Sequence, residues 1–419
     1  MNVHENIERP KATPVMSERR VSLIGAMLVA VGPISLALYT PAMPQIVEAF
    51  GTTEAAVKMT LSVYFAGFAV SQLFCGPLSD GFGRKPVTFV FMAIYAAASL
   101  LALVAPTVEV LIAARFLQGF GAAVGVAVSR ALVRDLFTHE RSARVMNLIG
   151  IILAAGPALA PTIGGLTMEV AGWQAIFLLM LAFGFMLTLV VRFFMHETVT
   201  RDLSRIRPRG LVQSYGALVK SRYFLASALV VTGSVGALYT QATLLPFLLM
   251  ERVGLTPSQF GVGMLMQSGM FFLGSLSVRF LMRRFSAFSL VPVGLSFIGI
   301  GSLALIYTLN VLPLSFLSVM GPVASYAFGI AFVNPAMMTA SVAPFPHMAG
   351  AASSLASFMQ MSGGLLGGSV AALIGDPVVA MSLIVPTMGA TAILSWLLWR
   401  RLPEPVLASQ ARVEPESPA

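Results

Sequence analysis

Polar groups are scarce in the long apolar stretches of this chain, and Arg115 is the most unusual of them. It begins the segment Arg115-Phe116-Leu117-Gln118, about two helical turns inside an apolar run. A guanidinium stays charged at physiological pH, so it cannot act as a proton carrier. Placing it in a bilayer costs at least ~2.5 kcal/mol, so we expect Arg115 to face an interior cavity or a partner. The alternative is a side chain that reaches outward to the membrane surface.

The residues that usually perform catalysis or bind metals are few and scattered. His4, His139, His196 and His347 fall in tails or near helix ends, and Cys75 has no second cysteine with which to pair. We find no cluster of nucleophile, base or metal ligands, so the sequence predicts neither an enzyme, nor a metal site, nor a cofactor. A membrane enzyme or a non-transporting sensor is kept as the alternative from another functional class.

The segments that carry these side chains are apolar and helix-like. Hydrophobic residues make up 57% of the 419 residues and charged residues only 10%, which leaves too little polar surface for a water-soluble globule. A bilayer core of ~30 Å requires roughly 20 apolar helical residues per crossing, and the runs are too uniform for an outer-membrane β-barrel. We therefore predict an all-α integral membrane protein. Its twelve transmembrane helices are expected near residues 21–46, 57–79, 87–106, 109–132, 144–168, 173–195, 222–249, 258–281, 288–308, 312–337, 348–373 and 378–400.

The net charge of +9 is distributed unevenly over the loops. With the N-terminus inside, the cations gather on the inward side, including a run from Arg201 to Arg222, whereas the outward side holds Lys58 and Arg252. This positive-inside pattern predicts a multi-pass protein of a bacterial-type inner membrane with both termini cytoplasmic. Nucleic-acid binding is not implied. The first apolar run is long and lacks a cleavage site, so we expect a retained helix rather than a signal peptide.

A polar interruption and an internal repeat indicate two halves of about six helices each. The interruption is rich in arginine and contains Pro208 and Gly210. Ala37-Leu38-Tyr39-Thr40 in the first helix recurs as Ala237-Leu238-Tyr239-Thr240 in the seventh. Two similar bundles place a substrate path at the seam between them. The expected organisation is a disordered cytoplasmic tail over 1–20, a six-helix bundle over 21–195, a linker over 196–221, a second bundle over 222–401 and a second such tail over 402–419.

A charged turn between the second and third apolar runs has the sequence Gly76-Pro77-Leu78-Ser79-Asp80-Gly81-Phe82-Gly83-Arg84-Lys85-Pro86. Glycines permit a tight reversal at the membrane surface, and the cations can meet lipid phosphates, so a plain positive-inside turn is one explanation. The turn also resembles the signature between helices two and three of the major facilitator superfamily. The matches are Gly76, Leu78, Asp80, Gly83, Arg84 and Lys85. In that family the turn is a conformational latch, which implies that Asp80 holds an arginine; Arg130 or Arg134 is the expected partner.

Two further segments extend this resemblance. The segment that begins at Arg115 resembles the superfamily's helix-four motif, in which the arginine is associated with proton coupling and Gln118 matches the motif's glutamine. The fifth run resembles the pattern of the antiporter branch, which is interpreted as a seal that favours export over symport. Close helix packing is the alternative explanation for its small residues. The matching positions are Gly156, Pro157, Gly164 and Gly165.

Finer resemblance points to the Bcr/CflA group of drug-resistance exporters, through residues 38–44, 129–136, 344–346 and 349–355. It implies the major facilitator fold, with two pseudo-symmetric six-helix bundles. It also implies an inner-membrane secondary transporter that exports drug-like amphiphiles by alternating access in exchange for protons. The alternative is a dedicated exporter of one endogenous metabolite, such as a nucleobase, amino-acid derivative or siderophore, with weak or no proton coupling. We expect a monomer whose partners are the substrate, protons and membrane lipids.

One position departs from that group. Its members usually carry an acidic residue in helix one, where this chain has Ala37. The carboxylates of the helical region lie in loops or close to helix ends, so none is expected at mid-membrane. A permanent cation would find no counter-charge in such a cavity, which favours neutral or anionic amphiphiles. Proton coupling would then use Asp80, Glu109 or another terminal acid, would use the titration of the substrate itself, or would be weak.

The remaining mid-helix polar residues are candidates for the lining of the cavity. A sparse set of donors in an apolar, methionine-rich chamber suits loose recognition of varied amphiphiles. For any one glutamine of the set, an ordinary interhelical hydrogen bond is an equally good explanation. Besides Arg115 and Gln118, the set comprises Tyr39, Tyr64, Gln72, Tyr239, Gln241, Gln267, Asn334 and Gln360.

Overall fold

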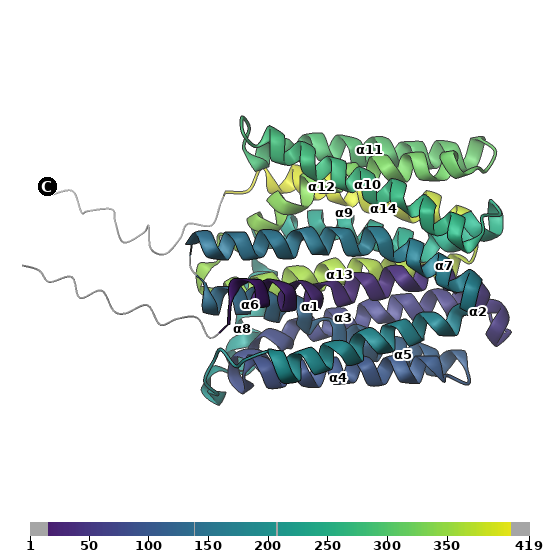
Figure 1. The fold of residues 1–419 in the computed structure, drawn as a ribbon. Coiled ribbons are helices and arrows are strands. Elements are labelled where there is room, and N and C mark those ends of the chain that lie inside the picture. Colours follow the sequence, from purple (N-terminus) through teal and green to yellow (C-terminus); the bar gives the residue numbers. More distant parts are fainter. Residues whose placement is uncertain (1–15, 138, 207, 404–419) are drawn as a thin grey trace, which may run out of the picture.

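The computed structural model describes residues 16–137, 139–206 and 208–403, and these residues form helices joined by short loops. The predicted disorder of the two tails concerns residues that lie almost entirely outside these ranges. Within them, eleven helices are long and apolar enough to cross a membrane. They lie side by side along one common direction (Figure 1). The predicted all-α membrane fold is therefore confirmed.

The helices of the first half and of the second half follow the predicted runs closely. The first bundle consists of α1 (Glu18–Tyr39), η1 (Thr40–Ala42), α2 (Met43–Phe50), α3 (Glu54–Phe82), α4 (Arg84–Leu103), α5 (Val108–Ala122), α6 (Val124–Leu136) and α7 (His139–Phe194). Between the bundles lie η2 (Leu203–Arg205) and α8 (Pro208–Lys220). The second bundle consists of α9 (Arg222–Pro246), η3 (Phe247–Arg252), α10 (Pro257–Leu281), α11 (Ala287–Val311), α12 (Phe316–Val342), η4 (Pro346–Met348), α13 (Ala349–Ile374) and α14 (Pro377–Trp399).

Most of the long helices begin at a polar residue that caps them. The side-chain oxygen of the cap accepts a backbone N–H of the first turn, which has no partner within the helix. Such a cap at Ser17 explains why α1 begins at Glu18 rather than at residue 21. The capping residues of α1, α3, α5, α9, α10, α11, α12 and α14 are Ser17, Thr53, Thr107, Ser221, Thr256, Ser286, Ser315 and Asp376.

The fifth and sixth predicted runs both lie in α7, which is 56 residues long. At 1.5 Å per residue, a straight helix of that length would span roughly 80 Å, more than twice a bilayer core. The chain instead breaks at Gly172, whose φ of 76° and ψ of −179° are not helical. Only glycine adopts this conformation readily, and Gly172 therefore separates α7 into two membrane-length segments. Because α7 is counted as one helix, the eleven helices correspond to the twelve predicted runs.

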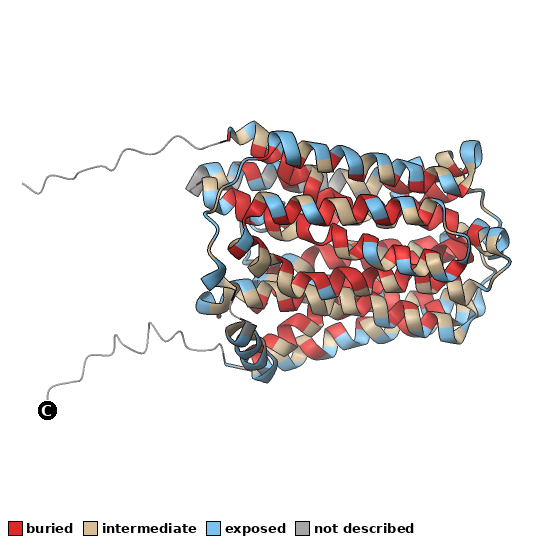
Figure 2. Cartoon of the chain, turned by 90° about the horizontal axis from the view of Figure 1, so that it is seen from below, coloured by how far each residue is buried: buried red, intermediate tan, exposed pale blue. Residues whose placement is uncertain are grey.

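Each half encloses an apolar core, and buried positions face inward along the whole length of the helices (Figure 2). The core of the first bundle includes Leu28, Phe68 and Val128, and that of the second includes Val231, Ile298 and Val323. At the seam between the bundles, α3 packs against α13 and α7 packs against α10. We call the end of the molecule with the Gly83 turn and α8 the linker end, and the end with α2 the far end (Figure 1).

The linker is more structured than the predicted polar interruption. Within it α8 packs against α9 and α13, and Leu218 on α8 is fully buried. The hydroxyl of Tyr215 donates to the backbone carbonyl of Leu73 on α3. Burial raises the pKa of Tyr215 to about 12, so this phenol stays a neutral donor at physiological pH. The linker therefore contacts both bundles at the linker end.

Candidate functional site

Arg115 lies on α5 in the interior of the first bundle and is fully buried. Its Cζ lies 4.3 Å from the centroid of the Tyr39 ring and 4.5 Å from that of Tyr64. Its Nη1 donates to Oε1 of Gln118 at 2.7 Å and lies 4.0 Å from Sδ of Met180. Arg115 therefore does not reach outward to the membrane surface, and the sequence expectation that it faces a partner inside the fold agrees with this geometry.

The groups around Arg115 are themselves held in place. Hydroxyls of Tyr39 and Thr60 share a hydrogen bond of 2.6 Å, and the hydroxyl of Tyr64 donates to the Gly32 carbonyl at 3.0 Å. Nε2 of Gln118 donates to Oγ of Ser99 at 2.8 Å. Side chains from α1, α3, α4 and α5 thus hold one guanidinium between two tyrosine rings, and ring faces attract a cation through the aromatic quadrupole.

Two nitrogens of this guanidinium have no hydrogen-bond partner. Nε and Nη2 of Arg115 are both buried and unpaired. No ion pair joins Arg115 to a carboxylate among the residues that the structure describes. Ala37, where the Bcr/CflA resemblance places an acid, is 6% exposed and has no group that could supply a charge. Within the described part of the chain, the site therefore holds a buried cation with aromatic neighbours and no counter-ion.

Four of the predicted lining residues, all in the second bundle, form two pairs. Nε2 of Gln267 donates to Oε1 of Gln241 at 2.8 Å, which leaves Nε2 of Gln241 buried without a partner. Nε2 of Gln360 donates to the hydroxyl of Tyr239 at 3.2 Å. The Tyr239 ring packs against Phe65 of the first bundle with centroids 4.9 Å apart. Tyr239 and Gln360 are therefore at the seam between the bundles.

Two further predicted lining residues stand apart from these pairs. Nε2 of Gln72 donates to the Ala123 carbonyl at 3.4 Å, an interhelical hydrogen bond within the first bundle. Asn334 on α12 is half-buried, and its Oδ1 is buried without a partner. For Gln72, the geometry matches the alternative given from the sequence, an ordinary hydrogen bond between helices.

The charged turn at the linker end is organised around Arg84, which is 3% exposed. Its Nη1 pairs with Asp80 and donates to Oγ of Ser79 at 2.7 Å, and its Nε lies 3.1 Å from Oδ2 of Asp135 on α6. A guanidinium has several donors in one plane, so it can hold two carboxylates from different helices at once. The turn therefore links α3, α4 and α6.

The prediction that Asp80 pairs with Arg130 or Arg134 is wrong for this structure. Asp80 pairs with Arg84, one helical turn along the chain, rather than with Arg130 or Arg134. Arg134 is largely exposed and lies 3.8 Å from Asp135, whereas Nη1 of Arg130 donates to Oγ of Ser353 on α13 at 3.3 Å. The physical reason is proximity, because Arg84 follows the tight turn and its side chain returns toward the end of α3.

Glu197 was not predicted from the sequence, yet it completes the same turn. Its carboxylate accepts the backbone N–H groups of Arg84 at 2.9 Å and of Lys85 at 3.2 Å, so it caps the N-terminus of α4. Gly83, with φ of 106°, leaves room for this contact, since a Cβ there would lie 3.0 Å from Cδ of Glu197. A carboxylate is favoured at a helix N-terminus by the helix dipole. The sequence signal for Glu197 was its position just after the last apolar run of the first bundle.

At the far end, Lys58 on α3 joins the two bundles, which the sequence had indicated only as an outward charge. The side chain is fully buried. Its Nζ donates to Oε2 of Glu54 at 2.8 Å and to the carbonyl of Gly375, at the end of α13, at 2.7 Å. It also lies 4.8 Å from the centroid of the Phe247 ring. The i,i+4 spacing of Glu54 and Lys58 was a signal for the first of these contacts only.

The small residues of the fifth predicted helix bring α7 close to its neighbours. A Cβ on Gly165 would lie 2.8 Å from the backbone carbon of Pro257 on α10, and one on Gly156 would lie 3.2 Å from Cγ1 of Ile34. Gly164 similarly faces the backbone of Leu38 on α1. The side chain of Pro157 lies outside the described residues. Across the seam, Oγ1 of Thr162 donates to the Gly261 carbonyl at 3.0 Å, so α7 and α10 touch backbone to backbone at the far end.

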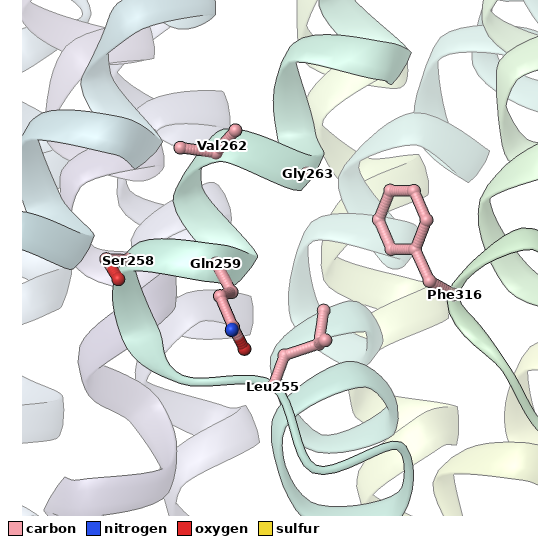
Figure 3. Close-up of a pocket in the computed structure, with 6 residues that line it drawn as sticks. All are labelled: Leu255, Ser258, Gln259, Val262, Gly263 and Phe316. Atoms are coloured by element: carbon pink, nitrogen blue, oxygen red, sulfur yellow. The ribbon is translucent and has the colours of Figure 1, made fainter.

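A surface pocket of about 430 Å³ lies at the far end of the second bundle, between α10 and α12 (Figure 3). It is lined by Leu255, Ser258, Gln259, Val262, Gly263 and Phe316. None of the predicted lining residues is among these six, and both helices belong to the same bundle. This pocket is therefore not the predicted path at the seam.

The sequence profile of the Major Facilitator Superfamily matches residues 25–368, which is most of the chain. The chain belongs to the Major Facilitator Superfamily. It is accordingly a multi-pass membrane transporter, with two six-helix bundles that meet at a seam.

Individual relatives and solved structures agree with this assignment. The chain is 32% identical to the multidrug resistance protein MdtL of Salmonella paratyphi B over 384 residues, covering 91% of this chain and 94% of MdtL. It is 29% identical to YdgK, an uncharacterized MFS-type transporter of Bacillus subtilis, over 372 residues, covering 86% of this chain and 90% of YdgK.

Among solved structures, a bacterial homolog of the human lysosomal transporter Spinster, in an inward-facing and occupied conformation, superimposes with a TM-score of 0.68. The match covers 91% of this chain and 96% of that chain at 16% identity. At this identity the likeness extends to the fold alone, and it confirms the two-bundle architecture.

Proposed function

We propose that this transporter exports drug-like amphiphiles across a bacterial inner membrane by alternating access, in exchange for protons, as a member of the Bcr/CflA group. The observation that carries the proposal is the placement of polar contacts across the seam. At the far end Lys58 reaches Gly375 and Thr162 reaches Gly261, whereas at the linker end Arg130 reaches Ser353. Single contacts of this kind at opposite ends can break alternately as two rigid bundles rock.

The orientation follows from the distribution of charge. The linker end carries the arginines of the charged turn and of the linker, and the positive-inside rule places such an end in the cytoplasm. Opening at the linker end would then admit substrate, and opening at the far end would release it outside. The resemblance of the α7 glycine pattern to the antiporter branch and the similarity to MdtL support export rather than uptake.

The class of substrate follows from the charges that line the helices. The interior presents Arg115, two tyrosine rings, glutamines and no carboxylate paired with them among the described residues. A permanent cation taken out of water here would have no counter-charge, whereas a neutral or anionic amphiphile meets donors and aromatic faces. The proposal is therefore selectivity for neutral and anionic amphiphiles.

Among the terminal acids, we propose Glu54 as the proton carrier rather than Asp80 or Glu109. Asp80 is engaged by Arg84, and Glu109 is exposed in the first turn of α5. Glu54 is a terminal acid whose partner, Lys58, crosses the seam. Protonation of Glu54 removes the charge that holds Lys58, so it would weaken the far-end contact between the bundles.

Substrate-triggered proton flux in everted vesicles tests the proposal. The lumen of everted vesicles containing the wild type should become more alkaline in response to neutral and anionic amphiphiles but not to cationic ones, because substrate enters in exchange for protons that leave. Arg115→Ala should abolish transport while the protein is still inserted in the membrane at wild-type amounts. Flux driven by cations would overturn the substrate class, and substrate movement without proton flux would overturn the coupling. Normal export by Arg115→Ala would remove the proposed role of Arg115.

A further inference from the structure

The free edge of Arg115 has a defined shape. An arginine guanidinium has two edges along which a pair of N–H bonds points in parallel, Nε–Nη2 and Nη1–Nη2, because Cδ blocks the third edge. Nη1 is occupied by Gln118, whereas Nε and Nη2 are the two nitrogens left buried without a partner. The unpaired donors are thus a matched pair on one edge, which is the arrangement that binds both oxygens of a carboxylate.

None of the described neighbouring groups accepts a hydrogen bond from this edge. Tyr39 and Tyr64 cover the faces of the guanidinium, and their hydroxyls are engaged with Thr60 and with the Gly32 carbonyl. Met180 offers only a thioether, at 4.0 Å from Nη1. A buried charge without a hydrogen-bonding counter-ion is strongly disfavoured, so the edge is energetically prepared for an anion.

We propose that the Nε–Nη2 edge of Arg115 binds the carboxylate of the exported amphiphile, with the aromatic body of that compound next to Tyr39 and Tyr64. The inference rests on the proposed export function and names the substrate class for it, which is organic carboxylates. Arg115 is fully buried in the state described, so the edge is reached only after the bundles move. Tyr64 precedes Phe65, whose ring touches Tyr239 across the seam, so movement at the seam displaces the wall of α3 beside Arg115.

A matched pair of ligands tests this directly on the purified full-length protein in lipid nanodiscs. The probes are para-octylbenzoate and its neutral isostere para-octylbenzamide, with binding measured at neutral pH. The wild type should bind the benzoate at least about tenfold more tightly, as expected for a bidentate charge-assisted pair. Arg115→Gln should bind both compounds alike. Arg115→Lys, which keeps the charge but lacks the parallel donors, should recover only part of the preference.

Arg283→Gln is the control variant, since it removes one positive charge at an exposed site on the linker end of the second bundle. It should keep the full preference for the benzoate. If Arg115→Gln fails to fold, the wild type alone still tests whether the carboxylate is recognised. Its preference should disappear as the pH is lowered below the pKa of the benzoic acid, while its affinity for the benzamide stays constant.

Three results would overturn the inference. They are equal affinity of the wild type for the two compounds, an unchanged preference in Arg115→Gln, or loss of the preference when chloride is added at constant ionic strength, which would assign the edge to a small inorganic anion. Failure of the export proposal is separable by transport assays in vesicles. Preferential binding without movement of either compound refutes export alone, and equal export of both compounds refutes the carboxylate site alone.

Discussion

Nζ of Lys58 on α3 donates to the backbone carbonyl of Gly375 on α13 at 2.7 Å, which joins the first bundle to the second at the far end. The carbonyl lies at the C-terminus of a helix, where the dipole favours a cation. Glu54 supplies the compensating charge at 2.8 Å. The amine is charged and fully buried, so this hydrogen bond is stronger than one between neutral groups. It must break whenever the far end opens.

Substituting Lys58 should shift the protein toward states that are open at the far end. Lys58→Met keeps the length of the side chain but removes the charge-assisted hydrogen bond, a loss of roughly 1.5–3 kcal/mol from the closed far end. We expect the open population to rise by at least about tenfold. Spin labels at Glu48→Cys and Leu312→Cys, in a Cys75→Ser background, would report this as a longer distance across the far end.

Lys220→Met is the matched control, because Lys220 is an exposed lysine at the end of α8 on the linker end. It should leave the distance distribution unchanged. The same distribution in Lys58→Met as in the unsubstituted background would show that Lys58 does not hold the far end closed.

Removing the charge of Glu54 should also open the far end. Glu54→Gln takes away the negative partner of Lys58, so the open population should rise above that of the unsubstituted background. Asp376→Asn is the control, because Asp376 pairs with Arg252. An unchanged distance distribution in Glu54→Gln would show that the Glu54–Lys58 pair does not hold the far end closed.

The latch should control turnover rather than affinity. Asp80→Asn leaves Arg84, a 3% exposed cation, with Asp135 as its ion-pair partner. Because Asp80 is 40% exposed, weakening this pair destabilises the linker-end arrangement by roughly 1 kcal/mol, so the maximal transport rate should fall by about fivefold. The apparent affinity for substrate should stay within about twofold of the wild type, because Asp80 is remote from the seam lining. Lost affinity with unchanged turnover would contradict this role.

The close approach of α7 and α10 should be sensitive to one methyl group. Gly165→Ala places a Cβ 2.8 Å from the backbone carbon of Pro257, and backbone atoms cannot move aside as a side chain can. Overpacking of this kind costs about 1–3 kcal/mol, so export should slow by several-fold and the far end should open. Gly216→Ala on α8, where no atom lies within 4 Å, should have no such effect. Wild-type transport by Gly165→Ala would show that α7 and α10 need not touch.

Much of the fold followed from the sequence because the bilayer imposes a simple rule. Apolar runs of about 20 residues must become helices there, since their backbone groups have no water to bond. The sequence likewise marked Arg115 and the Gly76–Pro86 turn, because a charge within an apolar run is rare and costly. The break in α7 was predicted as a gap between two runs, and Gly172 supplies its conformation.

Contacts between distant residues were decided only by the tertiary structure. Asp80 was expected to meet Arg130 or Arg134, yet the turn folds Arg84 back upon it, and Glu197 caps the following helix from more than a hundred residues away. Lys58 and Gly375 are 317 residues apart, and no local pattern relates them. The sequence by itself determined which segments cross the membrane and that Arg115 had to be sheltered. Only the packing of helices in three dimensions decided which donors of Arg115 were satisfied and which were left free, because hydrogen bonding depends on the direction of each N–H and not on spacing along the chain.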